Sequence, residues 1–252
     1  MVSVPARRAR TGREFEPLAA HAGPAYLRYS FTKGTDQEVS FLAGLLDADP
    51  AAPVVDVGCG PGRHARALGS FGWTVTGVDI SLTFLRAAGP GRWVRGDTRD
   101  LPIASGTAAV VLCLCQGGFG LLGGDDEGRA VAEMARILRP GGRLVLSAFS
   151  AYFAVRFLEE TDAFDAATGV NHETASVRNP EGDERSFDLW TTCFTPRELR
   201  ALMTAAKLVT EEIFSVTPGD YAARPPDLDH PEWLVVASKP VEPAGRIALP
   251  SV

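Results

Sequence analysis

The chain has 252 residues, with 25 Lys and Arg against 31 Asp and Glu, which gives a formal charge of −6. Hydrophobic residues make up 45% and charged residues 22%, so the composition excludes a disordered or fibrous chain. The acidic balance also argues against a general nucleic-acid binder, whose footprint is a basic face.

The N-terminal part of the chain shows no hydrophobic periodicity. Residues 1 to about 24 mix Arg, Gly, Pro and Ala, and we expect residues 1–34 to form a loose arm. From Thr35 onward apolar residues recur at helical spacing, and Thr35 with Glu38 has the pattern of a capping box. The sequence therefore predicts that an amphipathic helix follows the arm.

Short apolar runs alternate with helical segments between residues 53 and 150. The predicted strands are Val54–Val57, Thr74–Val78, Trp93–Arg95, Ala109–Leu114 and Leu144–Ser147. Three helices are predicted between these strands. The first starts near Arg63, and the second spans Ser81–Ala88. The third follows a cap at Asp125 or Asp126 and has an apolar face at Val131, Met134, Ala135 and Leu138. This alternation predicts a doubly wound parallel sheet with helices on both faces. Unbroken hydrophobicity makes the fourth strand the central one.

The segment 151–194 has no clean period and is long for a connection within a compact domain. We interpret it as an inserted substrate cap or lid, with one possible strand at Phe187–Phe194. A second capping box, with proline at the first helical position, starts a helix at Thr195. Val209–Val216 and Glu232–Ser238 are predicted to pair antiparallel at the sheet edge, and residues 241–252 form a tail.

A glycine-rich turn stands between the first strand and the next helix, in the sequence DVGCGPG from Asp56 to Gly62. Glycines let a backbone approach a ligand, and the helix N-terminus offers unpaired N–H groups to an anion. The spacing is G-x-G-x-G, so Arg63 occupies the place where a dinucleotide fingerprint has its third glycine. Asp56 would repel a pyrophosphate but suits a ligand that also carries positive charge.

Two further carboxylates stand at the ends of the next strands. Asp79 lies 19 residues after Gly60, where a carboxylate accepts hydrogen bonds from both hydroxyls of a ribose. Asp97 ends the third strand and offers a contact to an exocyclic amine. Because these strand ends face one crevice in a doubly wound sheet, the aspartates and the turn converge. They suit a ribonucleoside with a zwitterionic, cationic tail.

Five segments together resemble class I S-adenosylmethionine-dependent methyltransferases. They are DVGCGPGRH, VTGVDIS, RGDTRDLP, the strand before Gln116, and ARILRPGGRLVLSAF. The resemblance covers residues 53–150 and, more weakly, residues 195–239. It implies a seven-stranded sheet with the last strand antiparallel, within a methyltransferase domain at 35–240 whose cofactor-binding core is 53–150.

The resemblance also implies a binding site for S-adenosyl-L-methionine. Gly58, Cys59 and Gly60 would line the methionine part, together with Asp56 and Gly62 of the same turn. Asp79 would hold the ribose, with Ile80 beside it, while Asp97 and Thr98 would flank the adenine. Cys115 and Gln116 would close the site from the fourth strand.

The acceptor side departs from several relatives. After the fourth strand the chain reads Cys115-Gln116-Gly117-Gly118-Phe119, without the Asn/Asp-Pro-Pro-Tyr/Phe sequence of relatives that methylate nucleic-acid bases or proteins. The closely spaced glutamates of arginine methyltransferases are missing too, and no carboxylate cluster suggests magnesium. We therefore expect a small-molecule acceptor, no nucleic acid and no metal. The candidate acceptor-lining residues are Gln116, Phe119, Tyr152 and His172.

No catalytic base is evident, and His172 is a weak candidate because it lies in the unperiodic insertion. A non-catalytic protein that binds the cofactor or acts as a scaffold therefore stays open, and a nicotinamide oxidoreductase is disfavoured by Asp56 and Arg63. The longest apolar run, Ala108 to Cys115, is far shorter than the ~20 residues that cross a bilayer. With no secretory pattern at the N-terminus, we expect a cytoplasmic protein that does not engage membranes.

Overall fold

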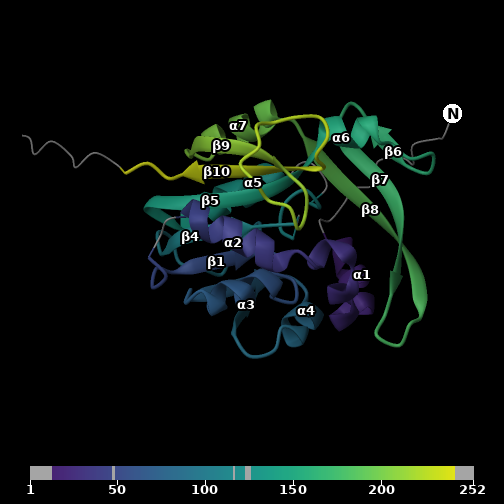
Figure 1. The fold of residues 1–252 in the computed structure, drawn as a ribbon, viewed down its shortest axis with the longest axis horizontal. Helices are drawn as coiled ribbons and strands as arrows, with labels where there is room; N and C mark the ends of the chain where they lie inside the picture. Colours follow the sequence, from purple (N-terminus) through teal and green to yellow (C-terminus); the bar gives the residue numbers. More distant parts are fainter. Residues whose placement is uncertain (1–12, 47–48, 116, 123–125, 242–252) are drawn as a thin grey trace, which may run out of the picture.

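A mixed β-sheet runs through the centre of the molecule, with helices on both of its faces (Figure 1). The computed structural model describes residues 13–46, 49–115, 117–122 and 126–241. Five parallel strands lie in the order β3 (Arg92–Arg95), β2 (Val75–Asp79), β1 (Val54–Val57), β4 (Ala108–Cys113) and β5 (Leu138–Ser150). The predicted parallel sheet and the central position of the fourth strand are confirmed.

The edge beyond β5 is antiparallel, as predicted. β10 (Glu232–Ser238) pairs antiparallel with β5, and β9 (Val209–Val216) pairs antiparallel with β10. These seven strands form the doubly wound sheet that the sequence predicts. Three additional strands, β6 to β8, extend it to ten.

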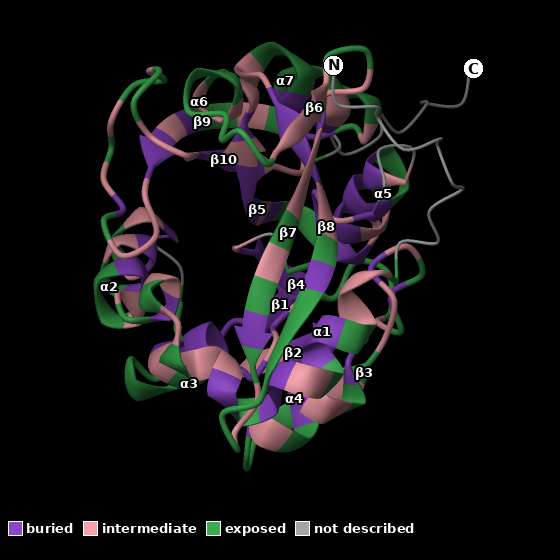
Figure 2. Cartoon of the chain, turned by 90° about the vertical axis from the view of Figure 1, so that its right-hand side faces the viewer, coloured by how far each residue is buried: buried purple, intermediate pink, exposed green. Residues whose placement is uncertain are grey.

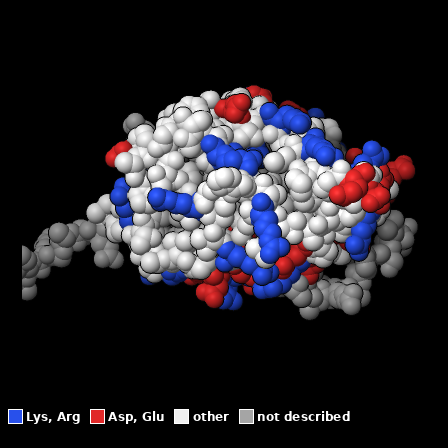
Figure 3. All heavy atoms as spheres, turned by 90° about the horizontal axis from the view of Figure 1, so that it is seen from below, with Lys and Arg blue, Asp and Glu red and all other residues white. Residues whose placement is uncertain are grey.

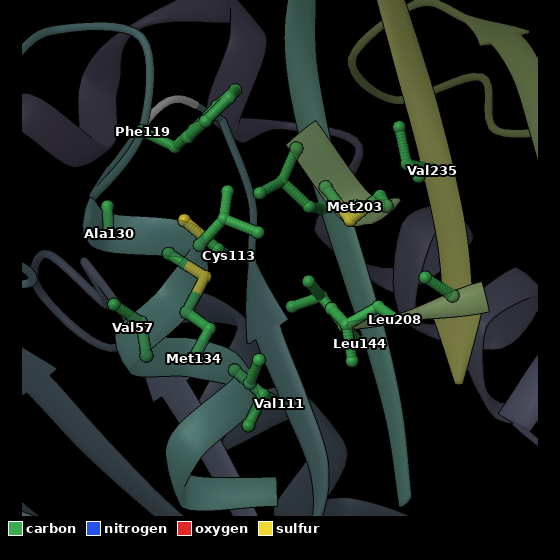
Figure 4. Close-up of a cluster of buried hydrophobic side chains, with 14 of the residues drawn as sticks. Val57, Val111, Cys113, Phe119, Ala130, Met134, Leu144, Met203, Leu208 and Val235 are labelled. Carbon is green, nitrogen blue, oxygen red and sulfur yellow. The ribbon is translucent and has the colours of Figure 1, made fainter. Parts of the chain in front are cut away.

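Helices pack on the two faces because the strands are apolar on both. Along β4, Val110 and Leu112 face a cluster that includes α2 (Thr35–Leu46) and α3 (Arg63–Ser70). Val111 and Cys113 face the opposite cluster, with α5 (Glu127–Ile137) and α7 (Pro196–Ala205). Figure 4 shows side chains of this second cluster interleaving between β4, β5, β10 and the two helices. The short α4 (Leu82–Ala87) is capped by Ser81, whose hydroxyl accepts from the Phe84 N–H.

One of the two predicted capping boxes is confirmed. At α7 the Thr195 hydroxyl accepts from the Glu198 N–H at 3.3 Å, and the Glu198 carboxylate accepts from the Thr195 N–H at 2.7 Å. The box predicted at α2 is wrong. Thr35 donates its hydroxyl to the Thr32 carbonyl at 2.8 Å, and the carboxylate of Glu38 is turned inward to distant partners.

The prediction for the start of α5 also needs correction. Asp126 occupies the N-cap position without a side-chain cap, because its carboxylate pairs with Arg99 at 2.7 Å. The alternative cap, Asp125, lies outside the described residues. Leu138, predicted on the apolar helix face, begins β5 instead.

The N-terminal arm is structured from Phe15 onward, contrary to the prediction. It forms α1 (Phe15–Ala22) and two short 3-10 turns, η1 (Gly23–Arg28) and η2 (Ser30–Thr32). Phe15, Leu18 and Ala22 stand at helical spacing, but Pro17 obscures this pattern because proline is unfavourable within most helices. Proline is tolerated here because it lies in the first turn.

The segment predicted as an aperiodic cap consists mostly of regular structure. After α6 (Ala151–Arg156) come β6 (Ala163–Asp165), β7 (Val170–Arg178) and β8 (Glu184–Phe194), and the predicted strand Phe187–Phe194 forms part of β8. β8 joins the sheet through two parallel pairs, to Phe149 and Ser150 of β5. Figure 2 shows the long β7–β8 hairpin crossing in front of the sheet and reaching α1. None of the described helices combines the length and apolar character needed to span a membrane.

Candidate functional site

The glycine turn after β1 is bonded to the end of β2. The N–H groups of Gly58 and Cys59 donate to the Val78 carbonyl at 2.7 and 3.1 Å. The Gly60 N–H donates to the carboxylate of Asp79 at 2.8 Å. Gly58 has a φ of +69°, and a Cβ there would lie 2.0 Å from the carbonyl carbon of Gly117. Glycine is required because the segment after β4 packs directly on the turn.

A narrow cavity of about 50 Å³ opens at the ends of β1, β2 and β3, and we call it the first cavity. Among the predicted cofactor residues, its lining includes Gly58, Asp79, Ile80, Asp97 and Thr98. Its remaining lining residues are Phe15, Val57, Val78, Gly96, Gly117, Gly118, Leu121 and Leu122. The structure therefore brings together residues from three strand ends that are distant in sequence.

Other predicted residues surround this cavity without lining it. The thiol of Cys59 is buried and donates to the Gly60 carbonyl at 3.6 Å. Gly62 is the N-cap of α3, in a left-handed conformation against the ring of Trp93. Cys115 lines a different cavity. Gln116 lies outside the described residues.

Two buried carboxylates create a negative site beneath the turn. Asp56 is 1% exposed, and its Oδ2 has no hydrogen-bond partner among the described residues. Burial raises the pKa of Asp56 to about 7, with Arg63 opposing and Asp79 adding to the rise. Burial also raises the pKa of Asp79 to about 6, despite the N–H groups of Ser81 and Gly60 that its carboxylate accepts. A cationic ligand group would relieve this unfavourable charge.

The third predicted aspartate has a charged partner. Asp97 accepts from Arg99 at Oδ1 (2.9 Å) and Oδ2 (2.7 Å), and this pairing lowers the pKa of Asp97. Oδ1 also accepts from the Arg99 backbone N–H at 3.0 Å, so Oδ2 is the oxygen that retains lone-pair capacity for a further donor. Beside it, the hydroxyl oxygen of Thr98 is buried and unpartnered among the described residues, and it lines the cavity. Both residues can therefore still bond a polar group placed in the cavity.

A larger cavity of about 400 Å³ adjoins the first, and we call it the second cavity. Phe15 and Leu121 line both cavities. The walls of the second cavity are mainly aromatic and aliphatic and come from α1, η1, η2, the β7–β8 hairpin and the chain around β10. The other lining residues are Leu18, Tyr26, Tyr29, Phe31, Cys115, Phe149, Glu173, Ala175, Ser176, Val177, Leu189, Thr191, Pro218, Pro231 and Glu232.

An ionic cluster that the sequence did not reveal anchors Cys115 behind these cavities. The guanidinium of Arg63 donates to Glu38 at 2.5 Å and contacts the Cys115 thiol at 2.7 Å, while His64 lies 2.7 Å from the same Glu38 oxygen. Glu38, His64 and Cys115 place potential ligand atoms within 4.8 Å of one another. The Arg63 cation already occupies this position, so the arrangement is unfavourable for a metal ion.

Three of the predicted acceptor residues lie elsewhere. Phe119 is fully buried and stacks on Phe194 with centroids 4.8 Å apart, and Figure 4 shows it within the hydrophobic cluster. Tyr152 lies on α6 beside a separate depression. His172 occupies the face of β7 opposite to the second cavity, stacks on Trp190 and lies 3.1 Å from Asp188. It does not reach the cavity because its side chain points away from it.

The sequence prediction also missed residues of the second cavity. Phe15, Leu18 and Tyr26 lie in the presumed arm, where the spacing of Phe15, Leu18 and Ala22 is the available signal. For Glu232 the signal is a charged residue at the start of an otherwise apolar strand. Its burial at 2% exposure marks it as more than a surface charge.

Comparison with known proteins finds methyltransferases that resemble this chain in sequence and in fold. The family described as "Methyltransferase domain" matches residues 55–146. A demethylmenaquinone methyltransferase from Corynebacterium kroppenstedtii is 38% identical over 42% of this chain and 45% of its own length. A SAM-bound amino pentose methyltransferase from Micromonospora echinaspora superposes with a TM-score of 0.58 at 26% identity, covering 81% of this chain and 91% of its own.

These likenesses show that the chain has the fold of class I S-adenosylmethionine-dependent methyltransferases, with the family match confined to residues 55–146. The chain spans about half the length of the curated relatives that it matches. The fold extends over nearly the whole described chain, since a methyltransferase from Streptomyces caelestis aligns with a TM-score of 0.70 at 22% identity. That alignment covers 88% of this chain and 98% of the other. Within this fold, α1 and the β7–β8 hairpin wall the second cavity.

Proposed function

We propose that the protein transfers the methyl group of S-adenosyl-L-methionine to a small-molecule acceptor. The donor would occupy the first cavity and the acceptor the second. The observation that supports this most directly is the contact between the two cavities at Phe15 and Leu121, beside two buried carboxylates with raised pKa values. A dinucleotide would bring a pyrophosphate against these carboxylates, whereas the donor brings an ammonium and a sulfonium.

The donor would be held by the residues that the family resemblance implies. The turn of Gly58 and Gly60 would face its methionine part, with the charge of Asp56 beneath. Asp79 would bind the ribose, since its oxygens accept only one N–H each from the described backbone. Ile80, Asp97 and Thr98 would flank the adenine. The remaining proposed contacts are Cys59, Gly62, Cys115 and Gln116.

S-adenosylmethionine supplies a methyl group on a sulfonium whose sulfur leaves as a neutral thioether, so the leaving group needs no protonation. The protein then contributes mainly by orienting the acceptor and by excluding water. The apolar walls of the second cavity serve both tasks. Its volume of about 400 Å³ falls within the range typical of small-molecule sites.

A small acceptor agrees with what the similar proteins are named for. One is named for demethylmenaquinone and another for an amino pentose. The surface adds no support for a nucleic-acid substrate on the face seen from below the sheet, where basic and acidic side chains are interspersed (Figure 3).

Calorimetric titration of the full chain with S-adenosylhomocysteine and, separately, with NAD tests the donor site. We expect binding of the first and none of the second. Asp79→Asn should weaken binding about tenfold or more because it removes a charged acceptor. The matched control, Asp188→Asn on the outward face of β8, should leave the affinity unchanged.

Binding of NAD, or an affinity unaffected by Asp79→Asn, would contradict the proposed donor site. A protein that binds S-adenosylhomocysteine but produces none from S-adenosylmethionine across a broad panel of small amines, phenols and acids would instead favour the non-catalytic alternative.

A further inference from the structure

The second cavity carries charge of a single sign. Its lining residues include no Lys, Arg or His among the described part of the chain, and its two carboxylic acids are Glu173 and Glu232. The other walls are apolar, aromatic or hydroxyl-bearing, apart from the Cys115 thiol, which the Arg63 guanidinium contacts at 2.7 Å. A cavity of this composition distinguishes ligands by their charge as well as by their shape.

The two carboxylates enter the cavity from different elements. Glu173 lies on β7 opposite Leu189 of β8, and both residues line the cavity. Glu232 is the first residue of β10 and pairs with Phe149 at the end of β5, where the sheet meets the cavity. Neither position depends on a flexible surface loop. Both carboxylates are therefore held by the sheet and its hairpin extension.

The surroundings of Glu173 do not compensate its charge well. Burial raises its pKa, and the neighbouring carboxylates of Asp162 and Glu159 raise it further, against a smaller opposing effect of His172. The other carboxylate, Glu232, lies near the Cys115 thiol of the same cavity. Burial and next the charge of Glu232 raise the pKa of this thiol, and the Arg63 guanidinium opposes the rise.

We propose that the acceptor is an apolar molecule bearing a basic amine, bound through Glu173 and Glu232, and that its nitrogen receives the methyl group. This inference rests on the proposed function. Aromatic faces at Tyr26, Tyr29 and Phe31 add a second source of affinity for a cation. A phenol or carboxylic acid is disfavoured, because the oxygen nucleophile would have to be an anion beside two carboxylates.

The proton balance suits an amine as well. The acceptor binds as an ammonium, which must lose one proton before its nitrogen has a lone pair. A glutamate oxygen takes that proton and passes it to solvent. The nitrogen lone pair then forms the new N–C bond while the C–S bond breaks, and its electron pair stays on sulfur as a neutral thioether. The product is the methylated ammonium.

A matched set of indole probes tests the inference. Tryptamine, tryptophol and indoleacetic acid have similar shapes but carry an ammonium, a hydroxyl and a carboxylate. Each is titrated calorimetrically into the full chain saturated with S-adenosylhomocysteine. We expect tryptamine to bind about tenfold or more tightly than tryptophol, and indoleacetic acid to bind most weakly.

Variants then locate the charge selectivity. Glu232→Gln and Glu173→Gln should each reduce the preference for tryptamine over tryptophol several-fold. The control Glu212→Gln, on the exposed edge strand β9, should leave it unchanged. Because Glu232 is buried, unaltered binding of S-adenosylhomocysteine verifies that its variant is folded. The half-buried Glu173 provides an independent test.

The result that overturns the inference is distinct from failure of the proposed function. If S-adenosylhomocysteine binds but tryptamine does not, or binds no better than tryptophol, the amine proposal is wrong while the donor site stands. If the preference for tryptamine survives in both glutamate variants, these residues do not recognise the amine. If S-adenosylhomocysteine itself does not bind, the proposed function fails first.

Discussion

Replacing Asp56 by Asn should change the stability of the ligand-free protein in a pH-dependent way. The pKa of Asp56 rises from an ordinary 3.8 to about 7 in the folded protein, mainly through burial. The folded state therefore binds this proton more tightly than the unfolded chain does. The stabilising contribution is complete below about pH 3.8 and is lost as the pH rises through about 7.

The size of the effect follows from this shift. Ionising the buried carboxyl costs about 4 kcal/mol of unfolding free energy at about pH 8 but only about 2 kcal/mol at about pH 5. Asn carries no such cost. Its amide has its own hydrogen-bonding penalty, which is the same at both pH values and cancels in the comparison. The stability of Asp56→Asn relative to the unmodified protein should therefore rise by about 2–3 kcal/mol when the pH is raised from about 5 to about 8.

Urea denaturation at the two pH values measures this change, provided that the dependence on urea concentration has the same slope in both proteins. Asp36→Asn, at an exposed carboxyl on α2, serves as the control and should show little pH-dependent difference. A stability difference between Asp56→Asn and the unmodified protein that is independent of pH would refute the reasoning. It would mean that the carboxyl is already compensated within the folded protein.

Three further predictions concern the turn, the ionic cluster and the hairpin. Gly58→Ala should abolish S-adenosylhomocysteine binding in calorimetry, since its Cβ would collide with the backbone of Gly117. Glu38→Ala should lower the free energy of unfolding in urea by about 3–5 kcal/mol, because it leaves the Arg63 cation buried without its carboxylate; a loss below about 1 kcal/mol would contradict this. His172→Ala should change methyl-transfer turnover less than twofold in a steady-state assay, because its ring points away from the second cavity, and a loss of about 100-fold or more would restore it as a catalytic base.

Local sequence signals predicted the doubly wound sheet well. β4 is apolar without interruption and wholly buried, and β1 is buried throughout with Asp56 as its one polar residue, as central parallel strands require. At α7, both halves of the capping box lie within four residues, so the sequence contains the complete interaction. These features depend on neighbours in the chain, and the rest of the fold did not need to be known.

Long-range pairing explains what could not be predicted. Glu38 has the spacing of a capping residue, but its true partners, Arg63 and His64, become neighbours only when α3 packs against α2. Within the described chain the glycine turn and Asp79 converge as expected, because parallel strand ends share one edge. The wall of the second cavity follows no such rule, since it is built by an insertion and by an N-terminal helix that were not recognisable as parts of one cavity.

His172 and Glu173 are adjacent on β7, and only one of them can face the second cavity. Adjacent residues of a strand point to opposite faces, so the register of β7 decides which of them enters the second cavity. Glu173 opposes Leu189 on the inner face, and His172 opposes Trp190 on the outer face. A shift of one residue would place the imidazole inside and expel the carboxylate. The inner face is set by the packing of Val177 against Leu18 and Ala22 of α1, so this N-terminal helix helps to decide which side chain faces the second cavity.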